Sequence, residues 1–247
     1  TEPLARYTRT SVFKDWFGDW EKNPEKSSKV VDENGEPLVV YHGSPFGGIE
    51  SFDRKRSAKI SSGLKEFGTY FTTNKKLADI YATAGKIKED VIEEIDRKIY
   101  ALNEALDKTK NSREYYRIEK EIEALRKSKS PKVYEAFLNI RDIKEFDAKK
   151  ETFDKAWNNL SVQASYKVAK NRDAMEFLRD GSFGVKKVEG IKASNIIDIV
   201  SSAKNENDLD FLGDVYLVFD TTEDAIRIIE DDDVKTRAQK AKKPSVK

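Results

Sequence analysis

The β-forming residues of this chain are divided among short runs, at 38–41, 68–74, 133–147, 194–200 and 215–220. Helical patterns of unequal length separate these runs, and the longest covers 86–128. Strands that alternate irregularly with helices favour an α+β fold over a regular series of βαβ units. Neither GxGxxG nor GxxxxGK[ST] follows any of the runs, which argues against a Rossmann or P-loop nucleotide fold.

The composition excludes several kinds of functional site. The chain has no cysteine, which rules out disulfides, thiolate metal sites and a cysteine nucleophile. His42 is the only histidine, so a histidine cluster for a metal or a mechanism with two histidines is excluded as well. We therefore expect no metal site.

The charge and hydropathy patterns bear on partners and location. Forty-six basic and 45 acidic residues leave a net charge of +1, so no overall field attracts the chain to nucleic acid or to an anionic membrane. No apolar run approaches the roughly 20 residues of a membrane helix. The first residues, TEPLARYTR, show no signal-peptide pattern. The sequence thus predicts a cytoplasmic protein with no membrane partner.

Aromatic residues mark the segment SVFKDWFGDWEKN near the start of the chain. Phe13, Trp16, Phe17 and Trp20 follow one another at spacings of three, one and three, which is typical of one face of a short amphipathic helix. Ser11 is the expected N-cap. We expect residues 11–30 to form an aromatic helical arm that packs on the core.

Residues 86–130 are predicted to form an inserted, antiparallel helical hairpin. Apolar residues recur at helical spacing, first at Ile92, Ile95, Ile99, Leu102 and Leu106, and then at Ile118, Ile122 and Leu125. Acid-first i,i+4 pairs support both helices, at Glu94–Lys98, Glu104–Lys108 and Glu123–Lys127. Asn111 and Glu114 resemble a capping box that starts the second helix. We favour a self-paired, solvated hairpin, and a partner-binding coiled coil is the alternative.

The remaining segments complete a prediction of one domain over 1–230. Asn34-Gly35 predicts a hairpin turn that leads into a strand at 38–41, with His42 at its C-terminal end. Residues 150–190 are expected to be a variable helical region. Residues 231–247 are expected to be a polar, frayed tail.

Three local motifs stand out as candidates for chemistry. The first is Tyr41-His42-Gly43-Ser44, and the second is Gly68-Thr69-Tyr70-Phe71-Thr72. The third is Tyr81, eleven residues after Tyr70. Taken singly, each has an ordinary structural explanation: a satisfied histidine, a strand start and a core tyrosine.

Together these motifs resemble the ADP-ribosyltransferases of the diphtheria-toxin and poly(ADP-ribose) polymerase type. That group is identified by a histidine, a tyrosine and usually a glutamate on three strands of a split sheet. The runs WFGDW, SKVVDENGEPLVVYHGS, GTYFTTN, VYEAFLNIRD and DVYLVFD are still more similar to the ADP-ribosyltransferase domains of phage and mobile-element polyvalent proteins. The resemblance covers about 11–85 and 133–147, with a weaker stretch at 194–228, and leaves out the hairpin and 150–190.

This resemblance implies a fold and an activity. The fold is an α+β, split antiparallel β-sandwich with flanking helices. The activity is a toxin-like mono-ADP-ribosyl transfer, with NAD+ as co-substrate and an unidentified protein or nucleic acid as the acceptor. It also implies the cytoplasm of a bacterial host as the location, with phage delivery as one route.

The resemblance also implies roles for single residues. His42 would bond a ribose hydroxyl, and Gly43 would hold the nicotinamide amide with its backbone, because glycine lets a ligand approach closely. Tyr70 and Tyr81 would sandwich the planar, cationic nicotinamide ring. Tyr41, Ser44 and Phe71 would complete the cofactor-binding set, and His42 and Tyr70 would also count as catalytic. Cleavage of the nicotinamide–ribose bond passes through an oxocarbenium-like state, so the protein mainly orients the ligand and stabilises charge.

The acidic position departs from the family pattern. The glutamate usually stands just before an aromatic-led strand, but here Val215 precedes Tyr216. Asp214 is the candidate catalytic acid, provided that the strand begins after it or that a bulge turns it inward. Further candidates are Glu135, Glu206, Asp208 and Asp210.

The valine leaves two kinds of function open. One is a mono-ADP-ribosyltransferase that uses Asp214 or needs no acid at this position. The other is an inactive module that binds NAD, ADP-ribose or a partner. A third interpretation, nucleic-acid binding, rests on the basic residues Arg54, Lys55, Arg56 and Lys59.

Overall fold

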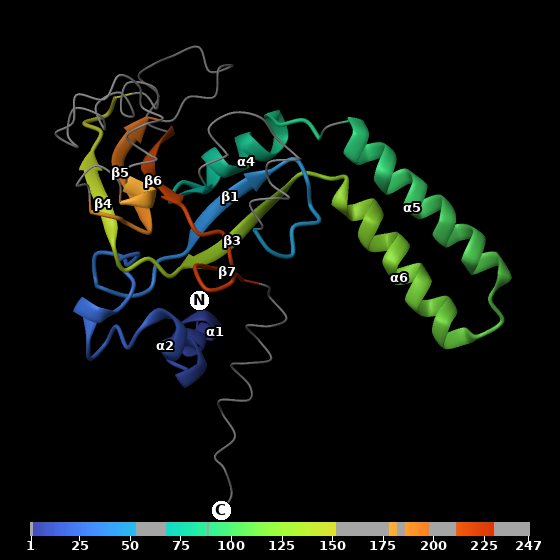
Figure 1. The fold of residues 1–247 in the computed structure, drawn as a ribbon, viewed down its shortest axis with the longest axis horizontal. Helices are drawn as coiled ribbons and strands as arrows, with labels where there is room; N and C mark the ends of the chain where they lie inside the picture. Colours follow the sequence, from blue (N-terminus) through green and yellow to red (C-terminus); the bar gives the residue numbers. More distant parts are fainter. Residues whose placement is uncertain are drawn as a thin grey trace, which may run out of the picture.

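The computed structural model describes residues 2–52, 68–87, 89–151, 178–181, 186–197 and 211–229. Its strands form one seven-stranded sheet in the order β4-β5-β6-β2-β1-β3-β7 (Figure 1). Their bounds are β1 Val40–Ser44, β2 Thr69–Thr72, β3 Lys132–Leu138, β4 Ile143–Asp147, β5 Gly190–Ile197, β6 Leu212–Val218 and β7 Ile226–Ile228. The neighbouring strands are antiparallel, apart from β4 and β5, which are parallel. The mixed helix-and-sheet architecture confirms the α+β prediction.

The middle of the sheet is nearly unpaired. β1 and β2 share a single residue pair, Tyr41 with Thr72, whereas β1 pairs with β3 along its whole length. The strands β4, β5 and β6 run in a direction clearly different from that of β1 and β3 (Figure 1). We call the junction between β1 and β2 the seam.

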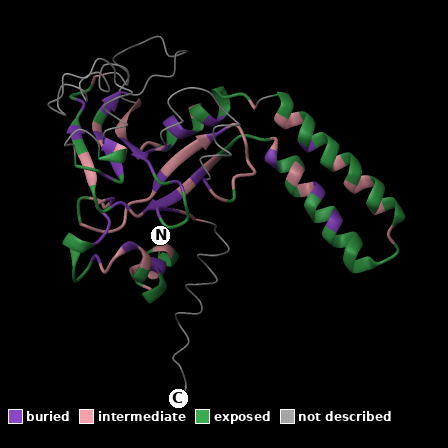
Figure 2. Cartoon of the chain, in the orientation of Figure 1, coloured by how far each residue is buried: buried purple, intermediate pink, exposed green. Residues whose placement is uncertain are grey.

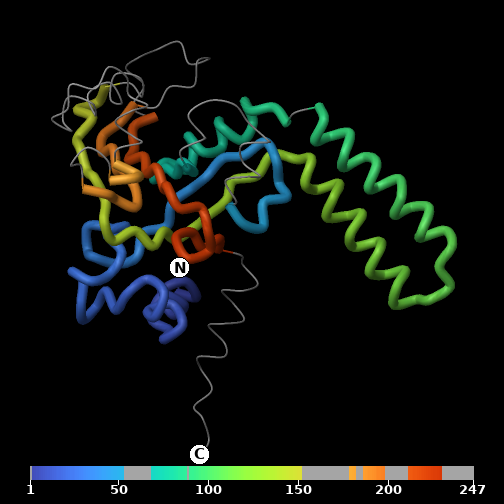
Figure 3. The backbone as a smooth tube through the Cα atoms, viewed as in Figure 1, coloured from blue at the N-terminus to red at the C-terminus, as the bar shows by residue number. Residues whose placement is uncertain are grey.

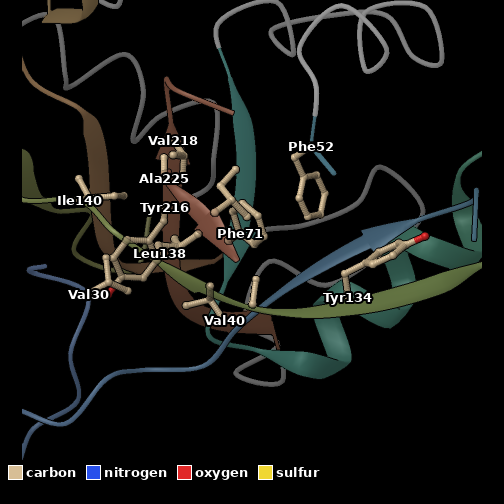
Figure 4. Close-up of a cluster of buried hydrophobic side chains, with 12 residues drawn as sticks. Val30, Val40, Phe52, Phe71, Tyr134, Leu138, Ile140, Tyr216, Val218 and Ala225 are labelled. Atoms are coloured by element: carbon tan, nitrogen blue, oxygen red, sulfur yellow. The ribbon is translucent and has the colours of Figure 1, made fainter. Parts of the chain in front are cut away.

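Hydrophobic clusters cover both faces of the sheet, and the buried residues concentrate on the strands (Figure 2). One cluster, drawn in Figure 4, gathers side chains from one face of the central strands, among them Val40, Phe71 and Tyr216. On the opposite face of β5 and β6, a second cluster contains Val215 and Leu217. The alternation of side chains along each strand explains this division.

The N-terminal residues form two short helices, α1 Glu2–Thr8 and α2 Ser11–Phe17, followed by the 3-10 turn η1 Pro24–Lys26. Phe13 and Phe17 are fully buried, and the ring centroids of Phe13 and Phe137 of β3 lie 5.0 Å apart. The aromatic residues of α2 therefore pack on the sheet. The N-cap is Thr10, whose hydroxyl accepts a hydrogen bond from the Phe13 N–H, so the prediction of Ser11 was wrong by one residue.

Helices α5 Glu89–Lys108 and α6 Ser112–Ser128 lie side by side and antiparallel, and they extend away from the sheet (Figure 3). Ile95, Ile118 and Ile122 are buried between them. The three predicted i,i+4 ion pairs are all present. The Asn111 side chain accepts hydrogen bonds from the N–H groups of Arg113 and Glu114, which confirms the cap.

Two predicted boundaries differ from the structure. The strand expected at 38–41 is β1 at Val40–Ser44, so His42 lies in its middle, because pairing with β3 continues as far as Ser44 and Lys132. The run 133–147 is two strands, β3 and β4.

The Asn34-Gly35 segment does form a turn, with Gly35 at φ +80°. The chain on either side of it meets only as an isolated bridge between Val31 and Pro37. The Asp32 carboxylate accepts the N–H groups of Asn34 and Glu36 and so closes the loop itself.

Several predictions lie outside the described residues. They are the candidates Glu206, Asp208 and Asp210, the basic residues Arg54, Lys55, Arg56 and Lys59, most of 150–190, and the tail at 231–247.

Candidate active site

His42 bridges the seam between β1 and β2. Its Nδ1 lies 2.8 Å from the backbone oxygen of Tyr70. Continuing the pairing of Tyr41 with Thr72 would bring Gly43 opposite Tyr70, but the structure has no such pair, and the Tyr70 oxygen is contacted by the imidazole. A carbonyl oxygen only accepts, so Nδ1 carries the proton of this contact, and in a neutral imidazole Nε2 is then the acceptor. The first two sequence motifs thus meet through a histidine of defined tautomer.

Aromatic side chains fix the plane of the His42 ring. The centroid of the Phe52 ring lies 4.9 Å from that of His42, in an edge-on arrangement, and the Phe71 centroid lies 5.6 Å away. Phe71 is only 1% exposed, and Figure 4 shows it within the core cluster. The structure therefore places Phe71 behind His42, where it supports the imidazole.

Gly43 is the point where α4 Lys75–Ala84 touches the sheet. A Cβ atom on Gly43 would lie 1.8 Å from the backbone oxygen of Ala78 and 2.9 Å from the nitrogen of Ala82. No side chain fits into that space. Glycine at this position thus allows direct contact between the helix and the strand backbone, in addition to the ligand contact that the sequence suggested.

Strand alternation and helix spacing orient Tyr70 and Tyr81 toward the same face of the sheet. Strand alternation directs Tyr70 away from Phe71, and it packs against the cluster that contains Val215. On α4, Lys75 reaches toward β3, where its ammonium lies 2.8 Å from the Glu135 carboxylate. At about 100° per residue, Tyr81 projects from the other side of the Gly43 contact, toward β2. Tyr81 is 39% exposed, so its ring is accessible to a ligand.

The other predicted cofactor residues, Tyr41 and Ser44, flank His42 on β1. The Lys75 ammonium lies 5.5 Å from the centre of the Tyr41 ring, and its hydrogen bond to Glu135 raises the pKa of Lys75. Ser44 is buried, and its hydroxyl accepts a hydrogen bond from the N–H of Phe46. Glu135 is therefore engaged with Lys75, and Ser44 shapes the turn after β1.

Val215, the residue before the aromatic-led strand where the resemblance leads us to expect a glutamate, is 2% exposed. It pairs with Thr72 of β2 and lies on the same face as Tyr70. Its isopropyl group can neither accept a hydrogen bond nor stabilise a cation.

Asp214 faces the opposite side of β6. Its carboxylate accepts the N–H of Asn195, and its other oxygen lies 3.4 Å from the Lys192 ammonium. The strand begins at Leu212, ahead of Asp214, and the bulge is in β5, where the register shifts between Ala193 and Ile196. Neither condition that would turn Asp214 toward Tyr70 is met.

Sequence reasoning did not identify Lys75 and Asn195 as neighbours of candidate residues. Lys75 had a readable signal, because it starts a helix directly after the Gly-x-Tyr-Phe strand. Asn195 has a φ of +54°, a conformation that asparagine tolerates better than most residues but that no local pattern announces.

A cavity of about 460 Å³ lies elsewhere on the sheet and contains none of the candidate residues. Its lining comes from α2, β6 and the loops beside β3, β5 and β7, and it comprises Asp15, Trp16, Asn139, Ile140, Arg141, Glu189, Val218, Asp220, Asp224 and Ala225. The polar part of this lining is dominated by carboxylates.

Among the described residues, no group of three or more histidine, aspartate or glutamate side chains is arranged to hold a metal ion. The described helices include none that is both long enough and apolar enough to cross a membrane.

Comparison with known proteins identifies the family. A family model described as ADP-ribosyltransferase in polyvalent proteins matches residues 32–223, more than three quarters of the chain. Comparisons with curated proteins and with solved structures give no significant match. The match contains every candidate site residue and the α5–α6 hairpin, and it begins after α1 and α2. The chain therefore belongs to the family of ADP-ribosyltransferase domains found in polyvalent proteins.

Proposed function

We propose that the protein is an NAD-dependent mono-ADP-ribosyltransferase, which cleaves the nicotinamide–ribose bond of NAD+ and transfers ADP-ribose to a macromolecular acceptor. Family membership supports a transferase that uses NAD+. The observation that carries the proposal is the contact between His42 Nδ1 and the Tyr70 oxygen. It joins the two motifs at a seam where β1 and β2 share a single residue pair.

The proposed roles follow from the placement of each residue. Nε2 of His42, the acceptor nitrogen, would take a hydrogen bond from a ribose hydroxyl. The backbone of Gly43 would hold the carboxamide, and the rings of Tyr70 and Tyr81 would enclose the nicotinamide. As the bond to nicotinamide breaks, positive charge develops on the ribose, and tyrosine faces stabilise a nearby cation.

The same proposal covers the flanking residues of β1. Tyr41 and Ser44 would border the bound dinucleotide on either side of His42. Phe71 would contribute by keeping the imidazole in its plane.

The proposal is tested by following label from NAD+ into acceptor protein, nucleic acid or water. We expect His42→Ala and Tyr70→Ala each to lower the rate by about 10- to 100-fold, the range of a lost orienting hydrogen bond or ring contact of about 1.4–2.7 kcal/mol. Val12→Ala, on the exposed surface of α2, is the matched control and should keep the wild-type rate. If both site variants transfer ADP-ribose at the wild-type rate, the assignment of the active site to these residues is wrong.

Asp214 has two candidate roles, as the acid of the reaction and as an anchor for the β5 bulge. To act as the acid, its carboxylate would have to leave Asn195 and Lys192 when NAD+ binds. We expect Asp214→Asn to stay within about threefold of the wild-type rate and to lose up to about 1 kcal/mol of stability, as for a partly exposed ion pair. Rate and thermal unfolding are measured together. A loss of more than about tenfold in rate (1.4 kcal/mol) with unchanged stability would instead establish Asp214 as the acid.

The buried Val215 favours one second candidate, a module that binds NAD or ADP-ribose without catalysis. Calorimetry separates the two functions. Binding of NAD+ without any release of nicotinamide would support the module, whereas release that depends on His42 and Tyr70 would support the transferase.

A further inference from the structure

The outward face of α6 carries a line of basic side chains. Arg113, Arg117, Lys120 and Lys127 follow one another at steps of four, three and seven residues, so they share one side of the helix. All four are exposed, as is Tyr116 beside them. We call these four residues the basic stripe. Figure 2 shows the outer surfaces of the hairpin as mostly exposed.

The stripe is separated from the other side chains of the hairpin. Ile118 and Ile122, which are buried against α5, lie on the opposite side of α6. By the same helical spacing, Glu114, Glu119 and Glu121 lie to the sides of the stripe, whereas Glu123 borders it and pairs with two of its lysines. In α5, acidic residues outnumber basic ones. The hairpin therefore presents positive charge mainly through α6.

The chemistry of the stripe favours a polyanion over other partners. Protein interfaces are usually anchored by buried aromatic or apolar side chains, but the stripe contains only Tyr116 and Ala124 between its charges. A helix that lies on a membrane needs an exposed apolar face next to its basic one, and the apolar face of α6 is already covered by α5. Interfaces with nucleic acid are polar and strongly positive.

We propose that the outward face of α6 binds the phosphodiester backbone of nucleic acid without base specificity. The stripe spans about 21 Å at 1.5 Å per residue, long enough to contact several phosphates of one strand. The proposal concerns binding alone, and it stands whether or not the protein transfers ADP-ribose.

Glu123 is the local competitor of the phosphates. Its carboxylate lies 2.8 Å from the ammonium groups of both Lys120 and Lys127, which lower the pKa of Glu123 to about 2. Exposed ion pairs of this kind contribute little to stability. A phosphate can therefore replace the carboxylate, and removing the charge of Glu123 should strengthen binding.

The test is fluorescence anisotropy of a short labelled DNA duplex titrated with the full chain, without NAD+. At low salt we expect binding in the range of about 10⁻⁴–10⁻⁶ M, weakening steeply between about 50 and 200 mM salt. The combined change R113Q/R117Q/K120Q/K127Q should weaken binding at least tenfold. It should also reduce the salt slope by about 3 to 4, the value for four phosphate contacts. E123Q should tighten binding about two- to fivefold, because it removes the competing charge of an exposed ion pair.

The matched control neutralises the same number of charges outside the stripe, three on α5 and one in the loop that follows it, as R97Q/K98Q/K108Q/K110Q. Glutamine is a good helix former, so both sets should keep the helix signal in circular dichroism. The control should bind within twofold of the wild type. Equal weakening by both sets, or no salt-dependent binding, would overturn the proposal. Anionic vesicles and polyglutamate are titrated in the same way. If either binds with an affinity equal to that of DNA, and the four stripe substitutions weaken that binding, the proposal is overturned in favour of that partner.

Discussion

Replacing Gly43 by alanine is expected to displace α4 from β1 and to abolish NAD+ binding. The added methyl group would lie 1.8 Å from the Ala78 oxygen, a helix backbone atom that no rotamer change can move away. Overpacking of this kind costs about 3 kcal/mol, the upper end of the usual range. For a chain of this size, that corresponds to a melting temperature lower by about 6–12 °C. Because α4 carries Tyr81, the ring would move with the helix.

Thermal unfolding and calorimetry with NAD+ measure this pair of effects. Gly85→Ala is the matched control: the new Cβ would lie 3.0 Å from Pro45 and 3.1 Å from the Tyr81 backbone oxygen, contacts that a small shift relieves. The control should lose no more than about 1 kcal/mol. If Gly43→Ala has the same melting temperature as the wild type and still binds NAD+, then the position of α4 does not depend on Gly43.

Introducing the family's glutamate at Val215 is expected to destabilise the protein in a pH-dependent way. The position is 2% exposed and surrounded by Ala193, Ile196 and Leu217, so ionisation of a carboxylate there is costly. Burial would raise the pKa of the new glutamate above its unfolded value of about 4.3. The free energy of unfolding is then greatest at pH values below the unfolded pKa, and it decreases as the pH rises through the pKa of the folded state. A rise of about 3 units removes about 4 kcal/mol.

Unfolding of the Val215→Glu variant between acidic and alkaline pH measures this effect. Val215→Gln, which has a similar shape and no charge, should be destabilised by the same amount at every pH. If the glutamate variant is as stable as the wild type at alkaline pH and transfers ADP-ribose faster, the side chain at position 215 contacts the bound ribose.

Local patterns were sufficient for the helices near the site and for the hairpin. Helix α4 follows from its apolar spacing and begins at the Asn74 cap, while α6 begins at Asn111 as its sequence predicts. These signals lie within a few residues of the structures that they specify, so one sequence is enough to read them.

Long-range pairing determined what the sequence could not show. The true extent of β1 depends on β3, about 90 residues away, and moves His42 from a strand end to a strand centre. The orientation of Asp214 depends on a bulge in β5 that turns at Asn195. The resemblance to the family named the residues that are expected to form the site. It could not predict that α4 rests on Gly43 or that Nδ1 of His42 meets the Tyr70 carbonyl.

The single residue pair at the seam also makes the sheet unequal in stiffness. On either side of the seam, several residue pairs join neighbouring strands. Among the described residues, Tyr41–Thr72 is the one backbone pair between β1 and β2, and it is supplemented by the His42 contact, by α4 and by the core cluster. Elements joined by few hydrogen bonds open at lower free energy than the rest of a fold. A dinucleotide bound to both strands would therefore be expected to join the two parts of the sheet more firmly and to reduce their movement relative to each other.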